Sequence, residues 1–446
     1  MSLYDALQIG VSGLDANSRA MSIFSSNIAN VNTVGYKTSS SEFETMLGSA
    51  DGGDAGLSAG VMANAQANIA QQGAEFATQS PTDLAITGNG FFCVNTAADQ
   101  SGQMLYTRAG SFLPDGAGDL RNSAGLYLLG YPLNADGSVA TGSLAPVNLN
   151  GFGGKGEATA TMSISANLDS DSTEADSTTY AAGQMIAGTV TPDFQTTMNV
   201  YDSQGGTQPV QVSYVKLDSP ANTWAYEVGY TGDPSNISSG NTPAAMIASG
   251  TLTFGASGEL ESLTGDSNST VSGGTLNFTI PWSSTSGLQT SPNQSISFDM
   301  GTIGKTDGTT QLAAGSAVNN SHVDGAIFGT VTGETIGADG TVYANYSNGL
   351  TQAAFKIPLA TFANPDGLSQ ASGNAYLANA SSGAALINQA QSGGSGSIQA
   401  YALEGSTVDL ATEFTNMITT QQAYSASARV VTTASQMLDT LMQIQR

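Results

Sequence analysis

The chain has 446 residues, of which 35 are acidic and 10 are basic, so its formal net charge is −25. The basic residues are scattered singly and form no cluster that could neutralise phosphates, which argues against nucleic acid and anionic membranes as partners. Because 40% of the residues are hydrophobic and only 10% are charged, we expect about two to four domains with real cores and a polar, mostly uncharged surface.

Targeting and membrane signals are weak in this sequence. The first basic residue is Arg19, and polar residues such as Asp5 and Asp15 interrupt the apolar positions before it, which does not fit a cleavable secretory signal. No window approaches the roughly 18 apolar residues of a membrane span, so no membrane insertion is expected. If the chain is exported, the route is expected to be leaderless. The single cysteine, Cys93, lies in an apolar run and is expected to be a buried core residue.

The N-terminal segment, from residue 2 to about residue 30, is predicted to form a long amphipathic helix. It contains no proline, and its apolar residues recur at the seven-residue spacing of a coiled-coil stripe. The stripe consists of Leu7, Leu14, Met21 and Ile28, with Phe24 from a second, broken set.

In the middle of the chain, apolar and polar residues alternate with a period of two and are separated by turn sequences, which predicts β structure. Residues 83–86 and 91–94 flank Gly88-Asn89-Gly90 and predict a β-hairpin. Further strands are predicted at residues 159–164, 196–201, 210–215, 223–230, 276–280, 341–346 and 354–357.

The C-terminal segment predicts a second long helix, over residues 407–444, starting from a capping box at Ser406. It would run roughly 57 Å at 1.5 Å per residue, which is too long for a small core. We expect the two helices to pair with each other and to leave a further apolar row, at Val430, Met437 and Ile444, that meets other subunits. The main stripe of this helix consists of Leu410, Met417, Tyr424, Val431 and Leu438.

Residues suited to catalysis or to metal binding are scarce. The single histidine, His322, lies in a predicted turn, and one histidine with one cysteine cannot make a zinc site. Residues 151–156 match G-x-G-x-x-G but precede a predicted strand instead of the helix that a dinucleotide needs. We therefore expect no catalytic residue, cofactor or metal site. Two alternatives stay open: a weak surface calcium contact near Asp169, and an extracellular enzymatic or glycan-binding β protein with paired carboxylates.

Three ordered regions of the sequence resemble the family of bacterial flagellar rod and hook proteins. The first is SSNIANVNTVGYK at residues 25–37. The second is TDLAITGNGFF at residues 82–92, followed by YTRAGSF at residues 106–112. The third is LEGSTVDL at residues 403–410, followed by TTQQAYS at residues 419–425.

Length separates the members of this family. Distal rod proteins are much shorter, whereas this chain inserts a β region between about residues 145 and 321, and residues 199–206 and 362–368 are hook-like. The resemblance therefore implies a hook subunit, with a distal rod subunit as the closer alternative.

The resemblance also implies how such a subunit works. It would leave the cell through the flagellar type III export apparatus and polymerise helically into a curved tube, the extracellular hook attached to the basal body. This homopolymer would act as a universal joint that transmits torque from rod to filament. The implied partners are further copies of the chain, rod proteins, hook-filament junction proteins and the hook cap. Asn27, Asn30 and Gly35 would end the first helix and turn the chain outward, although Asn27 could equally be a simple cap.

The expected fold is a mainly β multidomain protein. Its long N- and C-terminal helices would pair as a coiled coil, and its outer domains would be β-barrel-like or β-sandwich-like. The expected parts are a terminal helical domain (1–32 and 404–446), a connecting linker region (33–75 and 370–403), an inner β domain (76–145 and 322–369) and an inserted outer β domain (146–321).

Overall fold

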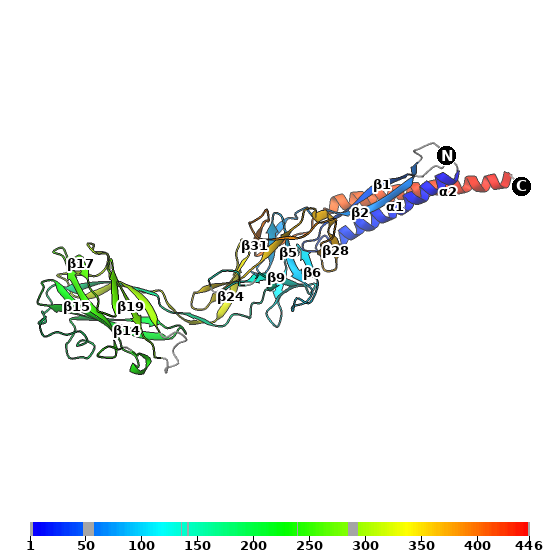
Figure 1. Cartoon of the computed structure of the whole chain (residues 1–446). Coiled ribbons are helices and arrows are strands. Elements are labelled where there is room, and N and C mark those ends of the chain that lie inside the picture. The colour runs from blue at the N-terminus through cyan, green and yellow to red at the C-terminus, as the bar shows by residue number, and fades with distance from the viewer. Residues whose placement is uncertain are drawn as a thin grey trace. The chain divides into compact units, whose positions relative to one another are not determined.

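The structure, a computed structural model, describes residues 3–47, 58–134, 136–140, 142–238, 240–283 and 293–444. The chain divides into two compact units (Figure 1). Unit 1 comprises Met1–Phe152, Gly333–Asn345 and Thr351–Arg446, and unit 2 comprises Gly153–Thr332 and Tyr346–Leu350.

Unit 1 contains two long helices, α1 (Leu3–Ala29) and α2 (Leu410–Ile444), which lie side by side (Figure 1). The start of α2 differs from the expected residue 407. The Asp409 Oδ1 atom accepts hydrogen bonds from the backbone N–H groups of Ala411 (2.9 Å) and Thr412 (3.3 Å). Asp409 is therefore the N-cap, and the predicted capping box at Ser406 is wrong because a better-placed acceptor follows three residues later.

A β-hairpin packs along α1 where a linker was expected. It consists of β1 (Ser39–Leu47) and β2 (Ser58–Ala67), which pair antiparallel. The hairpin contacts α1 directly, since the backbone N–H of Val61 donates to the Ser12 Oγ at 3.2 Å. Most residues of β1 are polar or exposed, so no clear apolar alternation signals the strand in the sequence.

The β region of unit 1 is built on a sheet with 13 strands among the described residues. Its core includes Phe92 and Phe112, whose rings meet edge to face at 5.6 Å. Cys93 is fully buried there, as predicted, and burial raises the pKa of its thiol to about 12. The strands are β5 (Phe91–Asn95), β6 (Met104–Thr107), β7 (Phe112–Pro114), β8 (Leu120–Asn122), β9 (Tyr127–Pro132), β10 (Ala145–Pro146), β24 (Val331–Ile336), β25 (Thr341–Tyr346), β26 (Thr351–Lys356), β27 (Pro358–Thr361), β28 (Ser369–Ala371), β29 (Ala375–Leu377) and β30 (Leu386–Gln389).

The hairpin predicted at residues 83–94 is wrong. Strand β4 (Leu84–Thr87) pairs with β31 (Ser397–Ala400), whereas β5 pairs with β6, β9 and β27. Gly88 and Gly90 between them have φ angles of 99° and 135°, a region that favours glycine. The chain therefore leaves one sheet and enters another instead of folding back. A second short pair, β3 (Glu75–Ala77) with β32 (Ala402–Glu404), lies next to this point in the chain.

Unit 2 contains two larger sheets that contribute to one hydrophobic core. One sheet follows the order β13-β14-β15-β16-β17, and the other follows β18-β19-β20-β12-β21, with β22 paired to β12. A two-stranded sheet, β11-β23, completes the unit. The bounds are β11 (Lys155–Glu157), β12 (Thr161–Asp169), β13 (Phe194–Tyr201), β14 (Thr207–Leu217), β15 (Thr223–Tyr230), β16 (Met246–Phe254), β17 (Leu260–Leu263), β18 (Ser269–Ser272), β19 (Thr275–Ile280), β20 (Gln294–Asp299), β21 (Thr310–Leu312), β22 (Ala317–Val323) and β23 (Ala326–Gly329).

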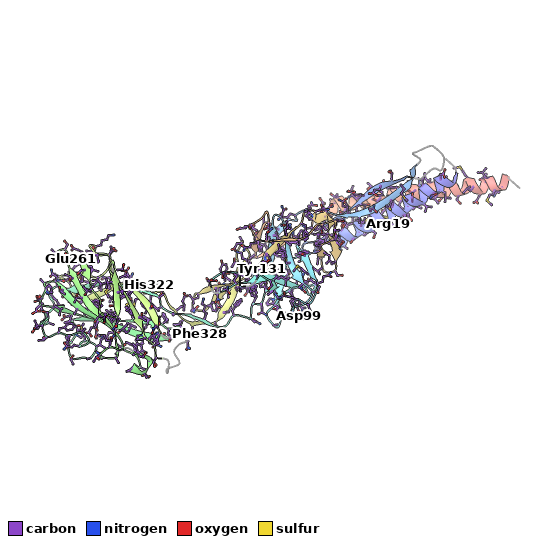
Figure 2. The ribbon with its side chains drawn as sticks, in the orientation of Figure 1. Arg19, Asp99, Tyr131, Glu261, His322 and Phe328 are labelled. Carbon is purple, nitrogen blue, oxygen red and sulfur yellow. The ribbon has the colours of Figure 1, made fainter. Side chains whose placement is uncertain are left out.

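The period-two pattern located these strands well. The predicted strands at residues 196–201, 210–215, 223–230 and 276–280 are confirmed by β13, β14, β15 and β19. The predicted turn at His322 is wrong, because this residue lies exposed on β22, opposite Ser163 of β12 (Figure 2). Unit 2 extends past residue 321 because β22 and β23 both continue its sheets.

The core of unit 2 offers a selective stability test, since both tryptophans of the chain, Trp224 and Trp282, are buried there. We expect Leu252→Ala, which empties a fully buried position on β16, to lower the free energy of unfolding by about 2–5 kcal/mol. Urea unfolding followed by tryptophan fluorescence measures this. Thr197→Ala, at an exposed position of β13, is the control and should change it by less than about 0.5 kcal/mol. Equal effects of the two variants would contradict the single shared core.

Candidate assembly surface and its anchoring cluster

The contact between α1 and α2 is made by small residues. The two helices run antiparallel, because Gly10 lies against Val431 near one end and Asn27 bonds Glu413 near the other. A Cβ atom added at Gly10 would lie 2.7 Å from a Val431 methyl group, and one at Gly13 would lie 3.1 Å from the Ser427 hydroxyl. The buried positions of α1 are Gly10, Gly13, Ala16, Ala20, Phe24 and Asn27. This face lets the helix backbones approach closely.

The predicted apolar stripes lie beside this contact. Of the predicted residues on α1, only Phe24 is buried, and the other four are half-buried. On α2, three are half-buried, whereas Leu410 and Tyr424 are exposed. The mutual packing of these ten side chains therefore stays a prediction for the assembled state. The half-buried residues are Leu7, Leu14, Met21, Ile28, Met417, Val431 and Leu438.

Helix α2 exposes large apolar side chains on two sides. With 3.6 residues per turn, Phe414 and Ile418 lie on the side turned away from the buried face, and Val430, Met437 and Leu441 lie on one flank of that face. These side chains are 47–55% exposed. The side chain of Ile444, predicted to share the second row, lies outside the described residues. These two apolar surfaces give α2 room for neighbours on two sides.

Asn27 connects four segments of unit 1. Its Nδ2 group donates to the Ser39 carbonyl (2.8 Å) and to Glu413 Oε1 (3.1 Å). Its Oδ1 atom accepts from the Tyr36 hydroxyl (3.1 Å) and from the Ser39 N–H (3.1 Å). The residue is fully buried inside α1, two positions before the helix ends. Asn27 is therefore not a cap, and it fixes β1 and α2 against the end of α1.

Asn30 and Gly35 lie in the turn after α1. The Asn30 Nδ2 group donates back to the Ser26 carbonyl at 2.9 Å, and its Oδ1 atom accepts from the Thr33 hydroxyl at 3.1 Å. Gly35 has a φ of 66° and donates its N–H to the Glu404 carbonyl at 2.8 Å. A Cβ atom at Gly35 would lie 2.7 Å from the backbone nitrogen of Ala109. Both the conformation and the space at this position require glycine.

A buried cluster of charges, Lys37, Arg108 and Glu404, joins the helices to the β region. The Lys37 ammonium donates to Glu404 Oε1 and to the Gln71 carbonyl. Arg108 Nη1 donates to Glu404 Oε2 at 3.0 Å, and the Gly73 N–H also donates to Oε1, at 2.7 Å. The three side chains are at most 3% exposed. Burial lowers the pKa of Lys37, against the opposing effect of Glu404.

This cluster was not predicted from the sequence, although a signal for it was present. Each of its three members lies inside one of the regions that resemble the rod and hook family, at residues 25–37, 106–112 and 403–410. Only 10% of the residues are charged. A lysine, arginine or glutamate inside one of these segments is therefore unusual and indicates a specific partner.

No group of three or more His, Cys, Asp and Glu side chains in the described ranges could hold a metal ion. No described helix is long and apolar enough to cross a membrane. The features that unit 1 does present are the exposed apolar side chains of α2 and the charged cluster that anchors the helices.

We expect Glu404→Gln to destabilise unit 1 strongly. The substitution leaves Lys37 and Arg108 buried without a counter-charge, at a cost of about 3–5 kcal/mol. Amide hydrogen exchange in β3 and β32 and thermal unfolding measure the loss. The control is Asp15→Asn, which breaks the exposed Asp15–Arg19 ion pair (62% and 57% exposed) and should cost less than about 1 kcal/mol. The role of the cluster is wrong if the two variants behave alike.

A second prediction separates backbone conformation from close packing. Gly35→Ala and Gly125→Ala both place a side chain at a positive φ, 66° and 81°, which costs about 1–2 kcal/mol. Only Gly35 lies against other backbone, since nothing lies within 4 Å of a Cβ at Gly125. Thermal denaturation should therefore show a clearly larger loss for Gly35→Ala. Similar losses of thermal stability in the two variants would show that the close contact between Gly35 and Ala109 does not affect stability.

Family models match most of the chain. "Flagella basal body rod protein" matches residues 7–37, and "Flagellar hook protein FlgE/F/G D1 domain" matches residues 85–169. "Flagellar basal body protein FlaE D2 domain" matches residues 167–326, and "Flagellar basal body rod FlgEFG protein C-terminal" matches residues 399–444.

Three relatives that match over nearly their full length are flagellar hook proteins. The flagellar hook protein FlgE of Rhizobium meliloti (strain 1021) is 36% identical over 449 residues, which cover 100% of both chains. That of Brucella suis biovar 1 is 32% identical, again over 100% of both chains. That of Salmonella typhimurium is 33% identical over 97% of this chain and 98% of the relative. With the resemblance, the two terminal helices and the β units in agreement, the chain belongs to the flagellar hook protein FlgE family.

Proposed function

We propose that the chain is the structural subunit of the bacterial flagellar hook, where it polymerises helically into a curved tube. It is located in the hook and is not an enzyme. The observation that carries this proposal is its full-length similarity to flagellar hook proteins. The two exposed apolar surfaces of α2 support it, because side chains such as Ile418 and Met437 need neighbouring subunits to cover them.

The helices are proposed to form the inner layer of the tube as a coiled coil. Support comes from the seven-residue spacing of the side chains that α2 turns toward α1, at Glu413, Thr420, Ser427 and Ala434. The β region of unit 1 would follow as the inner β domain. Residues 146–321 would form the outer domain, which is proposed to be sandwich-like because two sheets contribute to its one core.

The tube is proposed to act as a universal joint, stiff in twist and compliant in bending. The outer region is suited to sliding contacts, since residues 153–332 contain only three lysines and no arginine. One of these lysines, Lys216, already pairs with Glu174 at 3.0 Å within the chain. Neighbouring outer domains would therefore have few ion pairs to break as the tube bends.

Further partners follow from the position of a hook in the flagellum. We propose that the tube joins rod proteins at its base and hook-filament junction proteins at its tip. The hook cap would guide its growth, and the flagellar type III export apparatus would deliver its subunits. Support for the contact with rod proteins comes from the two matches to rod-protein families, which cover residues 7–37 and 399–444.

The purified chain is expected to assemble into curved tubes at raised ionic strength, as seen by negative-stain electron microscopy. Ile418→Glu and Met437→Glu each place a charge on one apolar surface of α2 and should abolish assembly. Gln436→Glu, at an exposed polar position beside Met437, is the matched control and should assemble normally. A wild-type chain that stays monomeric under all conditions would refute the proposed function.

A further inference from the structure

A cavity lies where α1, β1 and α2 meet, and its chemistry is incomplete. Its volume is about 360 Å³. It is lined by the aromatic rings of Phe24 and Phe43 and by the polar side chains of Ser41, Glu413, Asn416 and Thr420.

Glu413 is the unusual member of this lining. The residue is only 8% exposed, and its Oε1 atom accepts one hydrogen bond, from Asn27. Its Oε2 atom is buried and has no hydrogen-bond partner, and neither has the buried hydroxyl of Ser41. Burial also raises the pKa of Glu413. A buried carboxylate oxygen without a donor is costly. None of the hydroxyl and amide groups that line the cavity bonds Oε2, so a donor from outside would complete it, and a cationic one would serve best.

The terminal helices offer few cations that could supply it. The helical segments contain Arg19, Arg429 and Arg446. Arg19 is already paired with Asp15 at 3.0 Å, and Arg446 lies outside the described residues. Arg429 is exposed on α2 and makes no ion pair with any acidic residue that the structure describes.

Arg429 cannot reach this cavity within its own chain. It lies sixteen positions after Glu413 on one continuous helix, which separates the two residues by roughly 24 Å along the axis. If Arg429 supplies the donor, it therefore does so from a second copy. A planar guanidinium also suits a cavity with two aromatic walls, because it stacks on rings while it donates from its edge.

We propose that Arg429 of one subunit enters the cavity of a neighbouring subunit and donates to Glu413 Oε2. The inference rests on the proposed function, since it needs the polymer. Each subunit then offers an arginine and receives one, a head-to-tail contact that repeats along the assembly. The same contact links a residue on the outward side of α2 to a cavity formed with α1 and β1.

A double-mutant cycle on the critical concentration for salt-induced assembly tests this pair. Glu413→Gln and Arg429→Gln should each raise the critical concentration about tenfold, equivalent to about 1.4 kcal/mol. The double variant should also show about tenfold, because both changes remove one interaction. Arg19→Gln is the matched control and should change it less than twofold. Additive effects of about a hundredfold in the double variant, or no effect of either variant, would overturn the contact.

Cysteine cross-linking tests the geometry independently of these energies. In the Glu413→Cys/Arg429→Cys variant the two positions are too far apart for a short cross-link within one chain. Polymer treated with a bismaleimide about as long as an arginine side chain should therefore give a ladder of covalent multimers, and the monomer should not. Cys93 is buried, so it is not expected to form a cross-link. Glu413→Cys/Arg19→Cys is the matched control and should give no ladder. If the wild type forms tubes but the first variant gives no ladder, this inference fails and the proposed function stands. If the wild type forms no tubes, the proposed function itself fails.

Discussion

The buried contact of Glu404 with Lys37 and Arg108 is the interaction on which the organisation of unit 1 depends. The two terminal helices are separated by nearly the whole sequence, so their pairing needs a junction that sets where each leaves the β region. Lys37 follows α1, Glu404 precedes α2, and Arg108 belongs to the β region between them. With two cations around one buried carboxylate, removal of Glu404 leaves both cations buried without compensation, so the junction depends on this one side chain.

The small-residue face between the helices follows from this junction. Once the ends of α1 and α2 are fixed, Gly10 and Gly13 allow the backbones to approach, and larger side chains cannot occupy the centre of the contact. The large apolar side chains of α2 lie outside this contact, and Ile418 and Met437 remain exposed. The helix pair thus satisfies its internal contact with few large residues and keeps the rest for neighbouring subunits.

Sequence reasoning was accurate where structure depends on local pattern and failed where it depends on distant partners. Alternation identified β13, β14 and β15, because each buries side chains against the same core. The turn at Gly88 resembled a hairpin, yet β4 pairs with β31, some 300 residues away. The heptad stripes located both helices but not their contact, which is set by the glycines. Glu227 was equally hidden: this buried carboxylate accepts from the Tyr180 hydroxyl and from backbone N–H groups of a distant loop.

The positions of the basic residues show where the strong negative charge of the chain lies. Lys37 and Arg108 are buried, and Arg19, Lys216 and Lys356 are paired within the chain. Half of the ten basic residues are therefore already engaged, and most acidic residues face solvent without a partner of opposite charge among the described residues. Subunits of this kind repel one another at low ionic strength. At physiological ionic strength this repulsion is screened over about 8 Å, so contacts between the uncharged apolar side chains of the helices can dominate. The charge of the chain therefore limits the ionic strength at which subunits assemble, but it does not determine which surfaces they use.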